Sequence, residues 1–116
     1  MTFRTILASL LAAWGFLPLP AAAQDPPFDL SDPAQIAAGQ QTFDARCTGY
    51  CHGKDGLVGR GPSLRGRTDL SAEQIHRTIT NGRRDTGKIM PAWKGQLDDT
   101  TIWQLTAFIL SLRDAK

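Results

Sequence analysis

Two cysteines and a histidine lie in one short segment, which limits what this chain can fold around more than any other feature. The six residues from Cys47 to His52 contain both cysteines of the chain, separated by three residues, and His52 follows Cys51 directly. On a helix each residue advances by about 100°, so residues four positions apart share a face. The sequence therefore predicts that both thiols point to one side, with an imidazole beside the second.

This arrangement is one residue longer than the haem-attachment signature C-x-x-C-H. Attachment needs two thiols that add to the haem vinyl groups, and an imidazole next to the second thiol that can reach the iron. The extra residue leaves Cys51 and His52 adjacent, and Gly49 can adopt backbone angles that bring Cys47 into place. The alternative is a local disulfide between Cys47 and Cys51, which is common in exported chains.

The first 23 residues predict a secretory signal peptide. Arg4 is their only charged residue, and the largely apolar run Ile6–Leu17 follows it. Small residues end the segment at Ala23, as is typical of a cleavage site. We expect cleavage between Ala23 and Gln24 and export to the periplasm. The alternative is a retained membrane anchor, because residues 5–23 carry no charge.

The part that remains after cleavage is long enough for one small domain. Residues 24–30 contain prolines and aspartates and predict a flexible lead-in, and residues 31–116 predict the domain itself. The chain has 13 basic and 11 acidic side chains. This balance argues against a nucleic-acid binder, which needs many phosphate contacts, and against a polybasic membrane surface. We expect membrane contact only if the signal segment is retained.

Three segments have the apolar spacing of helices, and each begins at a capping residue. The first runs from about residue 31 to 46, the second from 71 to 82, and the third from 98 to 112. Gly39 lies within the first helix, where glycine costs about 1 kcal/mol relative to alanine. We interpret it as a point where another helix approaches closely. The glycine-rich segment 47–67 and the segment 83–97 are predicted to be loops.

The chain resembles the class I c-type cytochromes over residues 31–116. The matching residues are Gly39 and Phe43, the attachment segment with Gly53, the series Gly61 to Leu64, Asn81 to Arg83, Met90 to Trp93, and Phe108. The resemblance implies an all-α cytochrome c-like fold, with three or more helices and long loops wrapping a haem. It also implies that the first and last helices cross near a glycine and an aromatic side chain.

The same resemblance implies the cofactor and its ligands. One haem c per chain would be covalently bound through Cys47 and Cys51, with His52 and Met90 as the axial ligands of its iron. Met90 has support of its own, because it is the only methionine besides the initiator and lies in a polar segment. His76 is the alternative ligand, although we expect it to be exposed on the short second helix.

Further contacts follow from the resemblance. The Pro62 carbonyl would accept a hydrogen bond from His52, and Leu64 would pack on the haem. Arg67 and Trp93 are candidates for hydrogen bonds to a haem propionate. Ordinary structural roles are the alternatives: loop packing for Leu64, a core aromatic for Trp93 and a solvated charge for Arg67.

The predicted function is electron transfer without catalysis. An iron with two protein ligands has no open position, so we expect no small-molecule substrate. The expected partners are redox proteins: a periplasmic dehydrogenase as the electron source, and another cytochrome or a terminal oxidase as the acceptor. The domain would suit a cytochrome subunit of such a complex. Two alternatives stay open: a haem enzyme or sensor with a displaceable sixth ligand, and a disulfide-stabilised interaction domain without haem.

Overall fold

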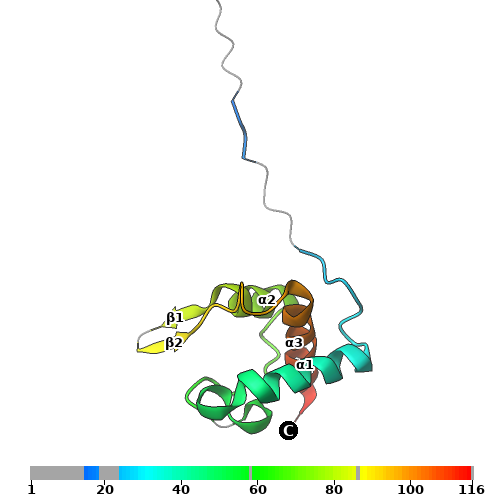
Figure 1. Ribbon diagram of the computed structural model, residues 1–116, viewed down its shortest axis with the longest axis vertical. Helices are drawn as coiled ribbons and strands as arrows, with labels where there is room; N and C mark the ends of the chain where they lie inside the picture. Colours follow the sequence, from blue (N-terminus) through cyan, green and yellow to red (C-terminus); the bar gives the residue numbers. More distant parts are fainter. Residues whose placement is uncertain (1–14, 19–23, 58, 86, 116) are drawn as a thin grey trace, which may run out of the picture.

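The computed structural model describes residues 15–18, 24–57, 59–85 and 87–115 (Figure 1). The elements are α1 (Pro33–Arg46), the wide helical turn Thr48–His52, the 3₁₀ turn Lys54–Gly56, α2 (Ala72–Asn81), β1 (Arg83–Asp85), β2 (Lys88–Met90), α3 (Asp99–Ser111) and the 3₁₀ turn Leu112–Asp114. Most of the predicted signal segment lies outside these residues. Among the residues described, no helix is long and apolar enough to cross a membrane.

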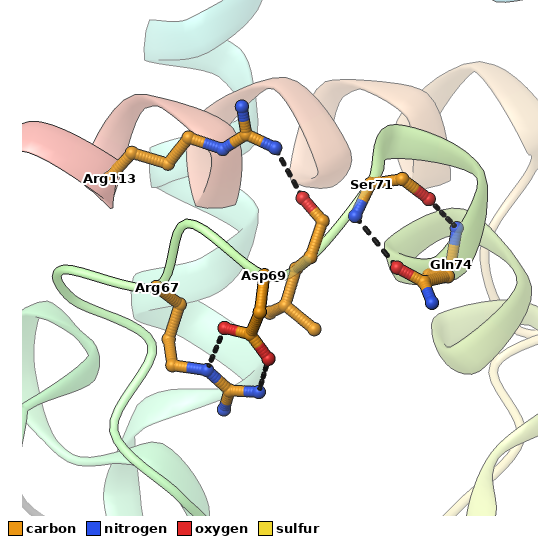
Figure 2. A network of polar contacts seen from close by, with 6 residues as sticks. Arg67, Asp69, Ser71, Gln74 and Arg113 are labelled. Carbon is orange, nitrogen blue, oxygen red and sulfur yellow. Dashed lines mark hydrogen bonds and ion pairs between the residues drawn. The ribbon is translucent and has the colours of Figure 1, made fainter.

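The starts of the three helices are as predicted, because each is fixed by a local cap. The Asp32 carboxylate accepts a hydrogen bond from the Ala34 amide at the start of α1. A capping box between Ser71 and Gln74 begins α2, with each side chain bonded to the other residue's backbone amide (Figure 2). Asp98 caps α3 by accepting from the Thr101 amide. Each cap satisfies amides that a helix leaves free at its N-terminus.

The first and last helices cross at Gly39, as the resemblance implied. A Cβ atom at this position would lie 1.9 Å from the Gln104 carbonyl oxygen and 3.0 Å from Phe108 Cβ. Close approach lets the Phe43 ring pack against the Phe108 ring in a tilted arrangement, with centroids 5.1 Å apart. Both rings are buried in the hydrophobic core. The crossed pair of α1 and α3 is the main helix–helix contact, and the loops pack around it (Figure 1).

We expect Gly39→Ala to destabilise the domain by about 1–3 kcal/mol, the range for an overpacked contact. The clash is with a backbone oxygen that cannot rotate away, and the better helix propensity of alanine offsets only about 1 kcal/mol. Urea unfolding measures the change in free energy. Gln40→Ala, at an exposed site on the same helix, serves as the control. A Gly39→Ala variant as stable as this control would contradict the close crossing.

The glycine-rich segment is tied to the end of α3. The Gly66 amide donates to the Leu112 carbonyl at 3.0 Å, and the Arg113 guanidinium donates to the Leu70 carbonyl (Figure 2). Leu64 is buried in the hydrophobic core, where it packs with Leu112 and the other core side chains. These contacts hold the segment against the crossed pair of helices although its own backbone has little regular structure.

The all-α prediction is wrong in one region, because the segment predicted as a loop after α2 contains a hairpin. β1 and β2 pair antiparallel, with Arg83 opposite Met90 and Asp85 opposite Lys88. Each strand has three residues and is largely exposed, so no apolar alternation marked it in the sequence. An Arg83–Asp85 ion pair of 2.6 Å accompanies the pairing. In the residues that the structure describes, the fold thus comprises three α-helices and a small two-stranded sheet.

Candidate haem site

A mostly apolar cavity of about 490 Å³ separates the glycine-rich segment from the hairpin, with α2 and α3 also contributing to its walls. This volume is within the range of small-molecule and cofactor sites. The structure brings every sequence-predicted site residue to this cavity: Cys47, Cys51, His52, Pro62, Leu64, Arg67, Met90 and Trp93. The attachment segment and the hairpin lie on opposite sides of it, in green and yellow in Figure 1. The two proposed iron ligands, His52 and Met90, therefore come from facing walls.

The extra residue between the cysteines is absorbed by a widened helical turn. The His52 amide donates to the Cys47 carbonyl at 3.1 Å, and the Gly53 amide donates to the Thr48 carbonyl at 3.3 Å. Both bonds span five residues, one more than in an α-helix, and turns of this kind recur at functional sites. Gly49 has φ +30° and ψ −121°, angles that residues with a Cβ avoid. Gly49 thus adopts backbone angles that other residues avoid, as expected, and its role in placing Cys47 for attachment stays a prediction.

Both cysteines are free thiols in different surroundings. Cys47 is half-buried and Cys51 is exposed. Burial, and to a lesser degree the neighbouring Cys51, raises the pKa of the Cys47 thiol to about 11. Cys47 is therefore protonated at neutral pH. The thiolate is the reactive form of cysteine, so this thiol reacts slowly at neutral pH.

The His52 ring is prepared to act as a ligand. Burial lowers the pKa of His52, and the Pro62 backbone opposes this by raising it. The imidazole is thus neutral near pH 7, the form that binds metals. Its Nδ1 is buried, yet no hydrogen bond of ordinary geometry joins it to Pro62 or to another group in the described part of the chain. The predicted hydrogen bond from His52 to the Pro62 carbonyl is therefore not formed, although the Pro62 backbone is near enough to influence the pKa of His52.

Two glycines, Gly59 and Gly61, lie directly against Cys51 and His52, a contact that was not predicted from the sequence. A Cβ at Gly59 would lie 2.5 Å from the Cys51 carbonyl oxygen, and one at Gly61 would lie 3.0 Å from His52 Nδ1. The Gly61 amide also donates to the Cys51 carbonyl at 2.6 Å. The backbone of this segment thus packs directly on the second cysteine and the imidazole. The clustering of glycines was visible in the sequence, but their contacts were not.

The opposite wall presents a thioether. Met90 ends β2, is half-buried and packs against the hydrophobic core, as does Trp93. The Trp93 amide donates to the Ile79 carbonyl at 3.0 Å, which fixes this segment to the end of α2. A single imidazole and a single thioether facing one apolar cavity suit an iron whose other ligands belong to a macrocycle. The residues present fit a haem.

His76 is not exposed, contrary to the sequence-based expectation. It is 7% exposed, stacks on Trp103 with ring centroids 4.0 Å apart, and bonds through Nε2 to Asp99 at 2.8 Å. These partners are on α3, and His76 is not among the residues that border the cavity. The expectation failed because the partners lie more than twenty residues away in the sequence. Of the two candidate sixth ligands, Met90 is the one at the cavity.

Arg67 borders the cavity but already has a partner. Its guanidinium bonds to both carboxylate oxygens of Asp69, each at 2.6 Å (Figure 2). These hydrogen bonds raise the pKa of Arg67 and lower the pKa of Asp69 to about 2. A haem propionate would therefore share this guanidinium with Asp69. Arg46, Arg60 and Lys88 also border the cavity and favour such an anion, whereas Arg83 is paired with Asp85, another lining residue.

Comparison with known proteins gives a consistent result. Residues 34–109 match the family described as cytochrome C oxidase, cbb3-type, subunit III. The cbb3-type cytochrome c oxidase subunit FixPc of Rhizobium leguminosarum bv. viciae is 39% identical over 85 residues, covering 71% of this chain and 29% of that protein. The subunit FixP of Rhizobium meliloti is 34% identical with the same coverage. The subunit CcoP of Azospirillum brasilense is 31% identical over 96 residues, covering 74% of this chain and 31% of that protein.

The chain spans less than a third of the length of these relatives. No solved structure matches it.

Proposed function

The chain belongs to the family of cbb3-type cytochrome c oxidase subunit III, a family of c-type cytochromes, and from this premise we propose that it carries single electrons on one covalently bound haem c. One observation carries the proposal: two free thiols and the His52 imidazole border the same apolar cavity as the Met90 thioether. Bound haem would supply an iron that alternates between its ferric and ferrous states.

In this proposal the chain's own residues perform three tasks. Cys47 and Cys51 would hold the ring by thioether bonds, and the adjacency of Cys51 to His52 would bring the imidazole to the iron. Met90 would be the second protein ligand of the iron, and a thioether ligand raises the reduction potential. Leu64 and the other apolar residues around the cavity keep water away, which also tunes the potential.

We propose a terminal oxidase as the electron acceptor. The relatives are named as subunits of cbb3-type cytochrome c oxidases, and the matched region is shared with this chain. The chain would act as an electron carrier associated with such a complex, with the oxidase itself performing catalysis. A periplasmic dehydrogenase remains the proposed electron source where the domain acts outside that complex.

Intact mass spectrometry of the purified protein tests this function and the proposed export together. We expect the mass of residues 24–116 plus one haem, because the signal segment is removed and the thioether bonds survive denaturation. The protein should be recovered from the periplasmic fraction. A mass without haem would contradict the attachment, whereas a full-length protein in the membrane fraction would contradict cleavage alone.

A further inference from the structure

The segment that contains Met90 is attached to the C-terminal end of α2. The Trp93 amide donates to the Ile79 carbonyl at 3.0 Å, and the Lys94 amide donates to the Thr80 carbonyl at 3.1 Å. Gly82, with φ +71°, lies so close that a Cβ there would be 2.5 Å from the Met90 carbonyl oxygen. A shift of α2 therefore shifts the backbone on both sides of Met90.

α2 is held against α3 by three buried side chains, Ile75, His76 and Ile79. Ile75 and Ile79 pack in the hydrophobic core with apolar side chains of α3 and also border the cavity. His76 contacts α3 as well, and it is the polar member of the three. Apolar packing therefore holds the two helices together, and His76 adds a directional contact to it.

His76 makes two different contacts with α3. Its ring stacks on the Trp103 indole at 4.0 Å between centroids, with an interplanar angle of 21°. Its Nε2 bonds to Asp99 Oδ1 at 2.8 Å, in the first turn of α3. Stacking and apolar packing allow small shifts, whereas a hydrogen bond has a preferred direction and length, so the bond to Asp99 favours one position of α2 along α3. The His76 carbonyl in turn accepts from the Thr80 hydroxyl at 2.8 Å.

We propose that His76 is a positioning residue, which locks α2 against α3 and thereby holds Met90 at the cavity. This inference rests on the proposed function, in which Met90 is the sixth iron ligand. When the His76–Asp99 hydrogen bond is lost, Met90 spends more time away from the iron, and an external ligand then binds with a higher apparent affinity.

The test measures the affinity of the oxidised holoprotein for imidazole, which competes with Met90 for the iron. His76→Phe keeps the stacking and removes the bond, and Asp99→Ala removes the acceptor. Each should tighten imidazole binding by about tenfold, as expected for the loss of one hydrogen bond to a charged group. Asp99→Asn keeps a bonding partner for either tautomer of His76 and should stay within about twofold of wild type.

Hydrogen exchange at the Trp93 and Lys94 amides provides a second readout, and both amides should exchange faster in His76→Phe. Arg77→Ala is the control, because it removes an exposed ion pair with Glu73 on the same helix. Variants that lose stability but keep wild-type imidazole affinity and exchange rates would overturn the inference. If Met90→Leu has the same imidazole affinity as wild type, Met90 is not the ligand and the proposed ligation fails. The exchange rates alone then decide whether His76 holds the segment.

Discussion

Met90→Leu is expected to abolish the weak charge-transfer band at the red edge of the oxidised spectrum, which marks a sulfur–iron bond. Leucine keeps most of the apolar volume of methionine, so the variant isolates the sulfur from the packing. The reduction potential should fall by about 0.1 V, within the roughly 0.8 V range that axial ligands span. The physical reason is that the thioether favours reduced iron, and its loss removes that preference.

In the same variant carbon monoxide should bind to the iron, because leucine cannot coordinate it and Met90 is the only thioether among the residues that border the cavity. Leu57→Ala is the control: Leu57 is apolar, is 52% exposed and is not among the residues that border the cavity, so the band and the potential should persist. A band retained in Met90→Leu would assign the ligand elsewhere. Rapid carbon monoxide binding to the wild-type protein would instead favour a sensor or enzyme with a displaceable ligand.

The helices were predictable because their determinants are local. The Asp32 and Asp98 caps and the capping box from Ser71 to Gln74 each involve residues at most three positions apart. Gly39 was also interpretable, because a glycine in a helix has a cost that only a close neighbour explains. The attachment segment was visible for the same reason: its chemistry is contained in six consecutive residues.

Features that depend on distant partners were not predictable. The burial of His76 is set by Trp103 and Asp99 on α3, and no pattern within α2 distinguishes this position from an exposed one. The hairpin pairs two three-residue strands, exposed except for the half-buried Met90, across a turn that contains Gly87, with φ +73°. The pairing of Arg67 with Asp69 was missed for a different reason: the partner is only two residues away, but nothing in the sequence distinguishes this pair from two solvated charges.

Cys51→Ser is expected to cost most of the covalently bound haem, whereas Cys47→Ser should retain one thioether bond. Cys51 adjoins His52 in the chain, so the bond at Cys51 holds the ring beside its ligand. Cys47 is separated from this pair by the wide turn at Gly49, and its contribution to alignment is weaker. Acid–acetone extraction and denaturing electrophoresis measure the covalent fraction. In Cys47→Ser, one unreacted vinyl group should shift the absorption spectrum of the extracted or denatured haem.

Gly49 separates the effect of spacing from the effect of the thiols. Gly49→Ala should lower attachment at Cys47 only, because an alanine at φ +30° costs about 1–3 kcal/mol of backbone strain and has no neighbour within 4 Å to clash with. Deletion of Gly49 shortens the motif to C-x-x-C-H, so the wide turn is no longer needed and both thioether bonds should form. If Gly49→Ala attaches haem as fully as wild type while the deletion variant does not, the wide turn would be a feature that attachment requires. The account of Gly49 as a residue that merely accommodates the longer spacing would then be wrong.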